Sequence, residues 1–173
     1  MQIDNTDRKK KSVFCDIDGT ISDDKWRRPI IYHGNTKYKR DFDAYNSACV
    51  DDKPNYVVLN VVKFLHQFYN IVLITARPIA YQKITKQWLG YHCLKFDALY
   101  MRPENNLDKD SVVKYKLMHT WFETNNLSST DVAAVFEDKP SCIEIFERML
   151  CFQIIKGDKY GTHKEDRIIT RTI

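Results

Sequence analysis

Val13-Phe14-Cys15-Asp16-Ile17-Asp18-Gly19-Thr20 joins an apolar run of strand length to two carboxylates and a glycine. A short run of apolar and aromatic residues is typical of a buried strand. Two acids spaced two residues apart, where such a strand stops, can share one metal ion and still take different protonation roles. Gly19 allows the chain to leave the strand sharply. The segment therefore predicts a reactive site at the end of a strand and not an ordinary acidic turn.

Further apolar runs of strand length follow along the chain, with longer segments of helical spacing between them. The expected strands lie at 12–16, 71–75, 96–101, 132–136 and 151–155. Helices are expected around 57–65 and 84–89, where apolar residues recur at helical spacing. This alternation predicts an α/β fold, a Rossmann-like parallel β-sheet flanked by helices, with its functional groups at the carboxyl ends of the strands.

Prolines and a glycine mark the expected helix boundaries. Pro54 and Pro140 are expected in the first turns of two helices, and Gly90 at the end of another. Residues 21–53 form an insertion between the first strand and the first expected helix. We call this insertion the flap and expect it to lie over the site as a small cap.

Length and composition set the class of protein. A chain of 173 residues, 43% hydrophobic and 29% charged, is expected to form a single globular domain over residues 1–173. A net charge of +4 is too mild to identify a nucleic-acid binder. The N-terminus lacks the apolar stretch of a secretory signal, and the apolar runs are too short to span a membrane. A cytoplasmic location without membrane attachment is expected, and the oligomeric state stays open.

The motifs along the chain resemble those of the haloacid dehalogenase superfamily of phosphohydrolases. The first motif of that family is an apolar strand followed by DxDGT, which residues 16–20 match in full. The later motifs are matched in the same order by Thr75, Lys114 and Asp138. The resemblance runs from residue 13 to residue 138, so it covers most of the chain.

By this resemblance the catalytic residues are Asp16, Asp18, Thr75 and Lys114. Asp16 would attack phosphorus and form an aspartyl phosphate, while Asp18 would act first as acid and then as base. Mg²⁺ would be held by the Asp16 carboxylate, the Asp18 backbone carbonyl and Asp138. Lys116 is a rival of Lys114, but two residues along a helix turn the side chain by about 200°, so only one of them can face the site.

Within the superfamily, the sequence is most similar to the 3′-phosphatase domain of phage-type polynucleotide kinase and to related small phage phosphatases. Tyr100-Met101-Arg102-Pro103 and Asp108-Lys109-Asp110 carry this likeness. By the same likeness Arg28, Arg77, Arg102 and Asp110 would bind the substrate. No GxxxxGK[ST] phosphate loop occurs in the sequence, so we expect a phosphatase without the kinase half.

The flap gives the main indication of the substrate. Residues 25–40 contain six Lys or Arg and no acid, interleaved with Trp26, Tyr32 and Tyr38. Cations beside aromatic faces suit a nucleotide or a nucleic-acid phosphate substrate. A 3′-phosphate end is slightly preferred over the 5′-phosphate of a mononucleotide. A non-catalytic nucleic-acid-binding module on the same fold is the alternative of another class, whereas a receiver domain is disfavoured because 96–101 ends without a carboxylate.

Overall fold

The sheet is the centre of the molecule. The structure is a computed structural model that describes residues 10–32, 41–146, 149–155 and 170–171. Within these residues the main sheet has the order β5-β4-β1-β6-β7-β8. Its strands are β1 (Ser12–Cys15), β4 (Asn70–Pro78), β5 (Ala98–Arg102), β6 (Val132–Glu137), β7 (Cys151–Gln153) and β8 (Thr170–Arg171). All neighbouring pairs are parallel except β7 and β8. The predicted α/β class is therefore confirmed.

β1 lies between β4 and β6 in the middle of the main sheet, and every one of its residues is buried. Val13 is paired with Ile71 of β4 on one side and with Ala134 of β6 on the other. Since these strands run parallel, their carboxyl ends meet at one edge of the sheet. Residues directly after β1 and at the end of β6 are thereby brought together.

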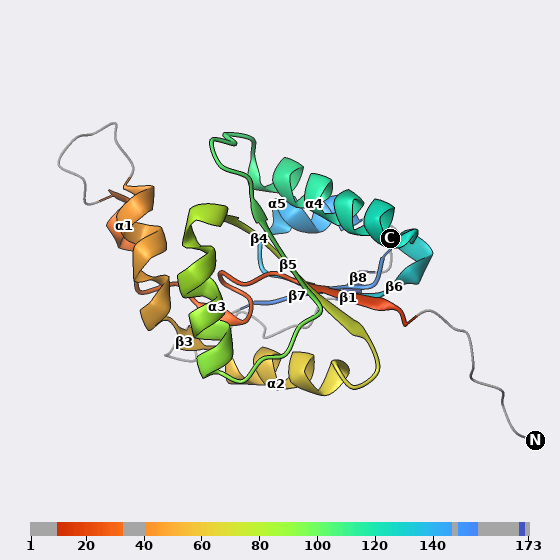
Figure 1. Ribbon diagram of the computed structural model, residues 1–173. Coiled ribbons are helices and arrows are strands. Elements are labelled where there is room, and N and C mark those ends of the chain that lie inside the picture. The colour runs from red at the N-terminus through yellow and green to blue at the C-terminus, as the bar shows by residue number, and fades with distance from the viewer. Residues whose placement is uncertain (1–9, 33–40, 147–148, 156–169, 172–173) are drawn as a thin grey trace, which may run out of the picture.

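Two layers of helices cover the sheet, because alternate residues of β1 face opposite sides. Val13 and Cys15 pack in one core cluster with residues of α2 (Tyr56–Leu65) and α3 (Gln82–Tyr91). Phe14 packs in the other cluster with residues of α4 (Asp110–Asn125) and with Ile143, the last residue of α5 (Pro140–Ile143). Figure 1 shows α4 and α5 on one side of the sheet and α2 on the other. This is the predicted arrangement of helices on both faces.

The flap is anchored by a small second sheet in which β2 (Ser22–Asp23) pairs antiparallel with β3 (Lys53–Pro54). Between them lie η1 (Arg28–Tyr32), α1 (Phe42–Ser47) and η2 (Ala48–Asp51). Lys37, Tyr38, Lys39 and Arg40 of the predicted basic segment lie outside the described residues. The remaining short helices are η3 (Ile79–Tyr81), η4 (Ser129–Asp131) and η5 (Glu144–Phe146). The assignment of residues 1–173 to one domain stays a prediction.

Some predicted boundaries were wrong. Pro54 belongs to β3 and not to the first turn of α2, which begins at Tyr56. Gly90 lies inside α3, which continues to Tyr91. Pro140 does occupy the first turn of α5, as predicted. Among the described residues, no helix has the length and apolar character that crossing a membrane requires.

Candidate active site

Asp16 follows β1 directly and is the buried centre of the site. Its side chain is only 4% exposed, and its Oδ1 lies 2.7 Å from the Lys114 Nζ. The same Nζ lies 2.6 Å from an oxygen of Glu137, the last residue of β6. Burial alone would lower the pKa of Lys114, but the charges of Asp16 and Glu137 outweigh it and raise the pKa. Lys114 therefore stays charged between two carboxylates.

Asp138 completes a cluster of three carboxylates with Asp16 and Glu137. One oxygen from each of them lies within 4.8 Å of the others. Gly19, with φ +89°, passes so close that a Cβ built on it would lie 2.1 Å from the Asp138 Oδ2. The glycine of DxDGT is thus required both by its backbone conformation and by the space that Asp138 occupies. Three carboxylates at this spacing are ligands that suit a hard divalent cation.

Asp18 points to a different group of residues. Its carboxylate is paired with the Arg27 guanidinium and, at 2.5 Å, with the Arg77 Nη2. The Thr75 hydroxyl donates a hydrogen bond of 3.3 Å to the second carboxylate oxygen of Asp18. Burial alone would raise the pKa of Asp18, but the charges of Arg77 and Arg27 outweigh it and hold the pKa well below its usual range. Asp18 is therefore ionised in this structure.

Arg27 is the most deeply buried cation near the site, with a side chain that is 0% exposed. Asp52, just after η2, accepts from its Nε and from its Nη2, both at 2.7 Å. The guanidinium carbon lies 4.1 Å from the centre of the Tyr45 ring. Asp52 also accepts a hydrogen bond of 3.0 Å from the indole N–H of Trp26. Arg27 thus links the flap to Asp18 through a dense set of buried contacts.

Thr75 and Arg77 reach the site from β4. The strand was predicted to end at Thr75 but continues to Pro78, with an irregularity in its pairing with β5 between these residues. Thr75 is 1% exposed, and its Oγ1 accepts from the Arg77 backbone N–H at 3.1 Å. The Arg77 Nη1 also donates a hydrogen bond of 2.9 Å to the hydroxyl of Thr85 in α3. Both predicted residues therefore face Asp18.

Arg28 lies at the rim of the site with a side chain that is 48% exposed. It makes two hydrogen bonds with Asp24, of 2.8 and 2.9 Å. Its Nη2 also lies 3.3 Å from the Asp138 Oδ2. The flap residue Arg28 is thus brought next to the carboxylate cluster.

Arg102 and Asp110 form an ion pair of 2.6 Å that continues to Lys139, whose Nζ lies 2.6 Å from Asp110. Lys139 follows Asp138 directly, so the ion pair borders the cluster. The rival lysine, Lys116, is 63% exposed and pairs instead with Asp108. The structure places Lys114 at Asp16 and Lys116 outside, while the catalytic and binding roles themselves stay predictions.

Three residues of the site were not recognised from the sequence. Glu137, directly before Asp138, was not among the predicted site residues, yet its side chain is 1% exposed and contacts Lys114. Its position at the end of an apolar strand was the available signal. Arg27 was counted with the basic residues of the flap, and Asp52 was not singled out. Nothing in the local sequence distinguishes this buried pair from the exposed charges around it.

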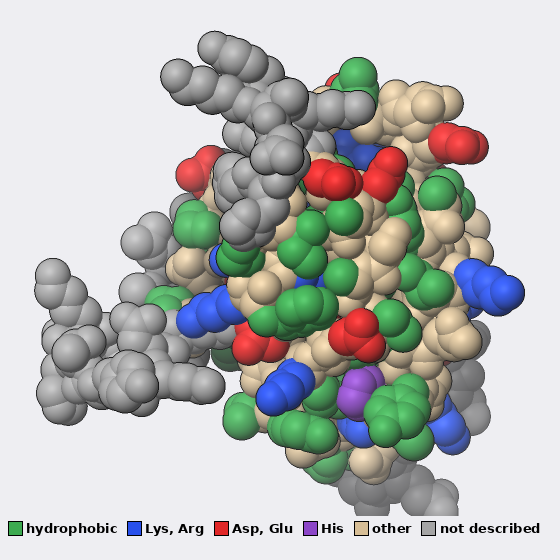
Figure 2. Space-filling view, turned by 90° about the vertical axis from the view of Figure 1, so that its left-hand side faces the viewer, with side chains coloured by type: hydrophobic (Ala, Val, Ile, Leu, Met, Phe, Trp, Pro, Cys, Tyr) green, Lys and Arg blue, Asp and Glu red, His purple; other side chains and the backbone are tan. Residues whose placement is uncertain are grey.

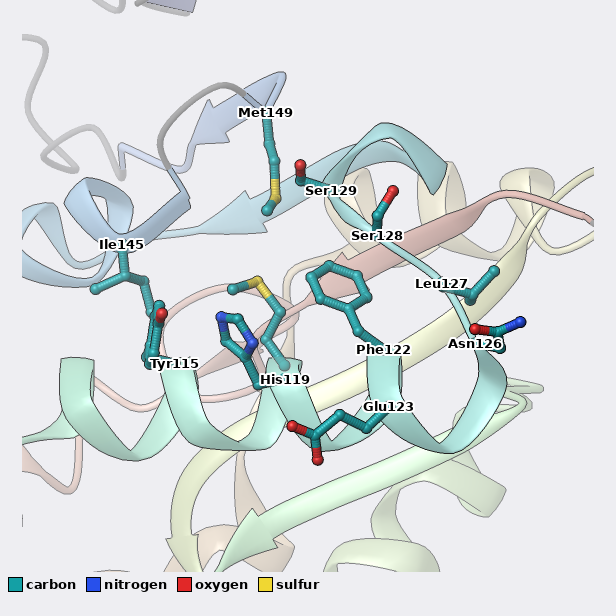
Figure 3. A pocket seen from close by; sticks show the side chains of 11 residues that line it. Tyr115, His119, Phe122, Glu123, Asn126, Leu127, Ser128, Ser129, Ile145 and Met149 are labelled. Atoms are coloured by element: carbon teal, nitrogen blue, oxygen red, sulfur yellow. The ribbon is translucent and has the colours of Figure 1, made fainter.

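A hollow of about 650 Å³ lies elsewhere, along the second half of α4. Figure 3 shows its lining side chains, among them His119, Phe122 and Met149, between α4 and the segment before β7. None of the carboxylates around Lys114 lines it. The hollow is therefore separate from the site built around Asp16.

This fold and site define a phosphatase of the haloacid dehalogenase type, with DxDGT after the central strand and a lysine beside the first aspartate. The chain belongs to the family of polynucleotide kinase PNKP phosphatase domains, whose family model matches residues 10–159. The family resemblance seen in the sequence is thereby confirmed.

Two relatives are similar to this chain over most of its length. A protein of Autographa californica nuclear polyhedrosis virus, assigned as a bifunctional polynucleotide kinase/RNA ligase, is 25% identical over 144 residues, which are 82% of this chain and 18% of that protein. A chain in the structure of the Pnkp1/Rnl/Hen1 complex matches with a TM-score of 0.65 at 27% identity, covering 86% of this chain and 47% of its own length. This chain therefore spans less than half of either relative.

A haloacid dehalogenase-like hydrolase from Streptococcus pneumoniae shares the fold, with a TM-score of 0.61 at 15% identity over 84% of each chain.

Gly19→Ala is expected to lower phosphatase turnover by about 100-fold, because the new Cβ must push Asp138 or the loop after β1 by an ångström or more. Phosphate release at saturating substrate measures the effect. Gly90→Ala is the matched control, since a Cβ there meets no atom within 4 Å. Turnover of Gly19→Ala within twofold of the parent would show that this close approach has no catalytic importance.

Proposed function

We propose that this chain is a magnesium-dependent phosphomonoesterase that acts through an aspartyl phosphate on Asp16, with 3′-phosphate ends of nucleic acids as substrates. The observation that carries the proposal is the buried Asp16 carboxylate, 2.7 Å from Lys114 and beside Asp138 at the carboxyl end of the central strand. A nucleophile, a cation and a further carboxylate gathered at one point are what phosphoryl transfer requires.

Asp16 is the proposed nucleophile. A carboxylate oxygen forms a bond to phosphorus while the ester P–O bond breaks and its electron pair leaves with the nucleoside oxygen. Water then attacks the aspartyl phosphate, which releases inorganic phosphate and restores Asp16. Lys114 neutralises the carboxylate and the phosphoryl oxygens during both steps, and the hydroxyl of Thr75 is placed to donate to the phosphoryl group.

The donor set at the edge of the sheet fits magnesium, which prefers oxygen ligands. Both Glu137 oxygens already accept hydrogen bonds, one from Lys114 and one from the Lys139 backbone N–H. Asp16 and Asp138, with the Asp18 carbonyl, are therefore the proposed ligands, and Glu137 positions Lys114. A bound magnesium ion would offset the negative charge that otherwise repels a phosphate from Asp16.

Asp18 is the proposed acid and base. Its two arginine partners favour the carboxylate, which suits the second step, where a proton is taken from water. Giving a proton to the leaving oxygen in the first step requires that the phosphate draw at least one arginine away from Asp18. Arg77 is suited to this exchange, because a guanidinium binds carboxylate and phosphate with the same geometry.

The nucleic-acid substrate is supported by the family and by the rim of the site. One solved relative belongs to a complex described as an RNA repair complex, matched at 25% identity over 91% of this chain. Arg28 and Lys139 expose about half of their side chains beside the carboxylate cluster. Trp26 is 49% exposed, and its indole N–H is fixed by Asp52, so the ring offers a rigid face on which a base can stack.

Phosphate release from a panel of esters tests the proposal. We expect a 3′-phosphorylated oligonucleotide to be hydrolysed faster than a 5′-phosphorylated one, a mononucleotide or a sugar phosphate, and we expect chelation by EDTA to stop every reaction. Trp26→Ala should lower kcat/KM for the oligonucleotide by about 10- to 100-fold and leave the sugar phosphate unchanged. Tyr91→Ala, which removes an 84% exposed aromatic ring at the end of α3, is the control.

Other outcomes of the panel would decide for the alternatives. Faster hydrolysis of 5′-mononucleotides would assign a nucleotidase. Salt-sensitive binding of single strands without any phosphate release would assign a binding module. Undiminished release in EDTA would exclude the role of magnesium. The cytoplasmic location predicted from the sequence is part of the proposal and is not tested by this panel.

A further inference from the structure

Helix α2 has two apolar faces, of which one is buried and the other is exposed in the part of the chain that the structure describes. Val58, Leu59 and Val62 are buried in the core beneath the sheet. On the outer side Val57 is 75% exposed, Val61 42% and Phe64 59%, and in the turn directly after the helix Phe68 is 55% exposed. A surface helix usually turns charged and polar residues outward. The outer face of α2 is instead a row of large apolar side chains.

The spacing of this row is that of a helix-pairing seam. Val57, Val61, Phe64 and Phe68 follow one another at intervals of four, three and four residues. In the helix such intervals place Val57, Val61 and Phe64 on one narrow stripe, as in the a and d positions of a coiled coil, and Phe68 follows in the next turn. The Phe64 and Phe68 rings lie 5.5 Å apart, so they form one continuous surface. Figure 2 shows hydrophobic side chains gathered at its lower edge, the end of the molecule where α2 lies in Figure 1.

We propose that this α2 seam, residues Val57, Val61, Phe64 and Phe68, pairs antiparallel with the same seam of a second copy of the chain around a two-fold axis. The two small residues lie at one end of the seam and the two large ones at the other. An antiparallel pair therefore sets Val57 against the partner's Phe68 and Val61 against the partner's Phe64. Each contact then matches a small side chain with a large one, which fills the space evenly.

The charges beside the seam favour a second copy. Asn60 and Gln67, both exposed, border it on one side, and Val58 and Leu65 border it on the other. In an antiparallel pair Asn60 of one copy meets Gln67 of the other, and two amides can bond to each other. Lys63 is half-buried and lies off the stripe. Within α2 and the turn after it, self-pairing along the stripe therefore sets no like charges against each other, and a charged partner would find no complement on these residues.

The area is sufficient for a dimer. Asn60 and Gln67, both exposed, widen the surface beside the seam. Aromatic side chains carry about 150–250 Å² each, so the four seam residues together with these two amides offer on the order of 500 Å² per copy. Two copies together would bury about 1,000 Å², which is the lower limit of specific interfaces. A dimer that dissociates on dilution is expected, with the acidic edge of each sheet left open.

Sedimentation velocity of the full chain over a concentration series tests the pairing. We expect a species of twice the 20.5 kDa chain mass that dissociates on dilution. Phe64→Lys should raise the dissociation constant of the dimer by at least about 30-fold. Tyr115→Lys, at an aromatic residue of α4 that is 47% exposed, should leave it unchanged. Phosphate release, which is independent of the seam, should persist in both variants.

Three results would overturn the proposal. One is a mass of 20.5 kDa at every concentration, as expected if another domain or partner covers the seam. The second is a dimer that Phe64→Lys does not weaken, which would place the interface elsewhere. The third is assembly beyond the dimer, which a closed two-fold pair cannot give. Circular dichroism checks the fold, and Val57→Lys, at the most exposed seam position, replaces Phe64→Lys if that variant is unfolded.

Discussion

Asp16→Asn is expected to reduce phosphate release by about 10⁴-fold or more, which is the order of loss seen when a catalytic nucleophile is removed. The amide is no nucleophile towards phosphorus, and it cannot form the ion pair with Lys114. The two side chains have the same shape, and Lys114 keeps Glu137 at 2.6 Å. The variant should therefore remain folded while turnover is lost. Release of inorganic phosphate, with a melting curve as the check on folding, measures both.

The matched control is Asp51→Asn, which makes the same change at an exposed acid of η2 outside the site. It should retain the activity of the parent. Substantial turnover by Asp16→Asn would exclude the aspartyl phosphate. Rapid quenching of the parent enzyme in acid should in turn trap phosphate covalently on the protein, whereas Asp16→Asn should trap none.

Arg27→Met is expected to lower the free energy of unfolding by about 3–5 kcal/mol, because it leaves Asp52 buried without its cation. For a chain of this length, such a loss lowers the melting temperature by roughly 6–20 °C. The same change removes a partner of Asp18 and frees the loop that carries Trp26, so turnover should fall as well. Thermal and urea unfolding measure the stability, and phosphate release measures the turnover.

A second substitution tests whether the loss of stability comes from the broken ion pair or from the packing around Arg27. Adding Asp52→Leu to Arg27→Met removes the orphaned charge, so the double variant should lose clearly less stability than the sum of the two single variants. Lys116→Met is the control for an exposed ion pair and should cost about 1 kcal/mol or less. Additive losses in the double variant would show that Arg27 and Asp52 do not act as a pair.

Local pattern was enough to predict the central strands of the sheet but not β8 at its edge. The runs at 12–16, 71–75 and 132–136 became the three central strands, with ends shifted by up to three residues. These strands are buried on both faces, so their apolar character alone marks them. Pro54 misled the prediction, since its fixed φ suits a first helical turn as well as the edge of the small sheet.

The site was predictable where chain order and strand ends determine it. The motifs named Asp16, Thr75, Lys114 and Asp138. The parallel sheet brings the strands and the helix that carry these residues to one edge. Glu137 was not named, because whether a residue at a strand end points into the site or into solvent depends on the register with the next strand. The turn of a helix allowed only one of Lys114 and Lys116 to face the site, and the family motif selected Lys114.

The sequence by itself determined the α/β class, the central strands and the acids that follow them, because each of these depends on neighbours in the chain. The tertiary structure alone decided which charges are buried. Arg27 and Arg28 are adjacent in sequence, yet one is fully buried between Asp18 and Asp52 and the other is half exposed at the rim. That difference comes from the folding of the flap onto the sheet, which joins residues too far apart in the chain for any local pattern to connect.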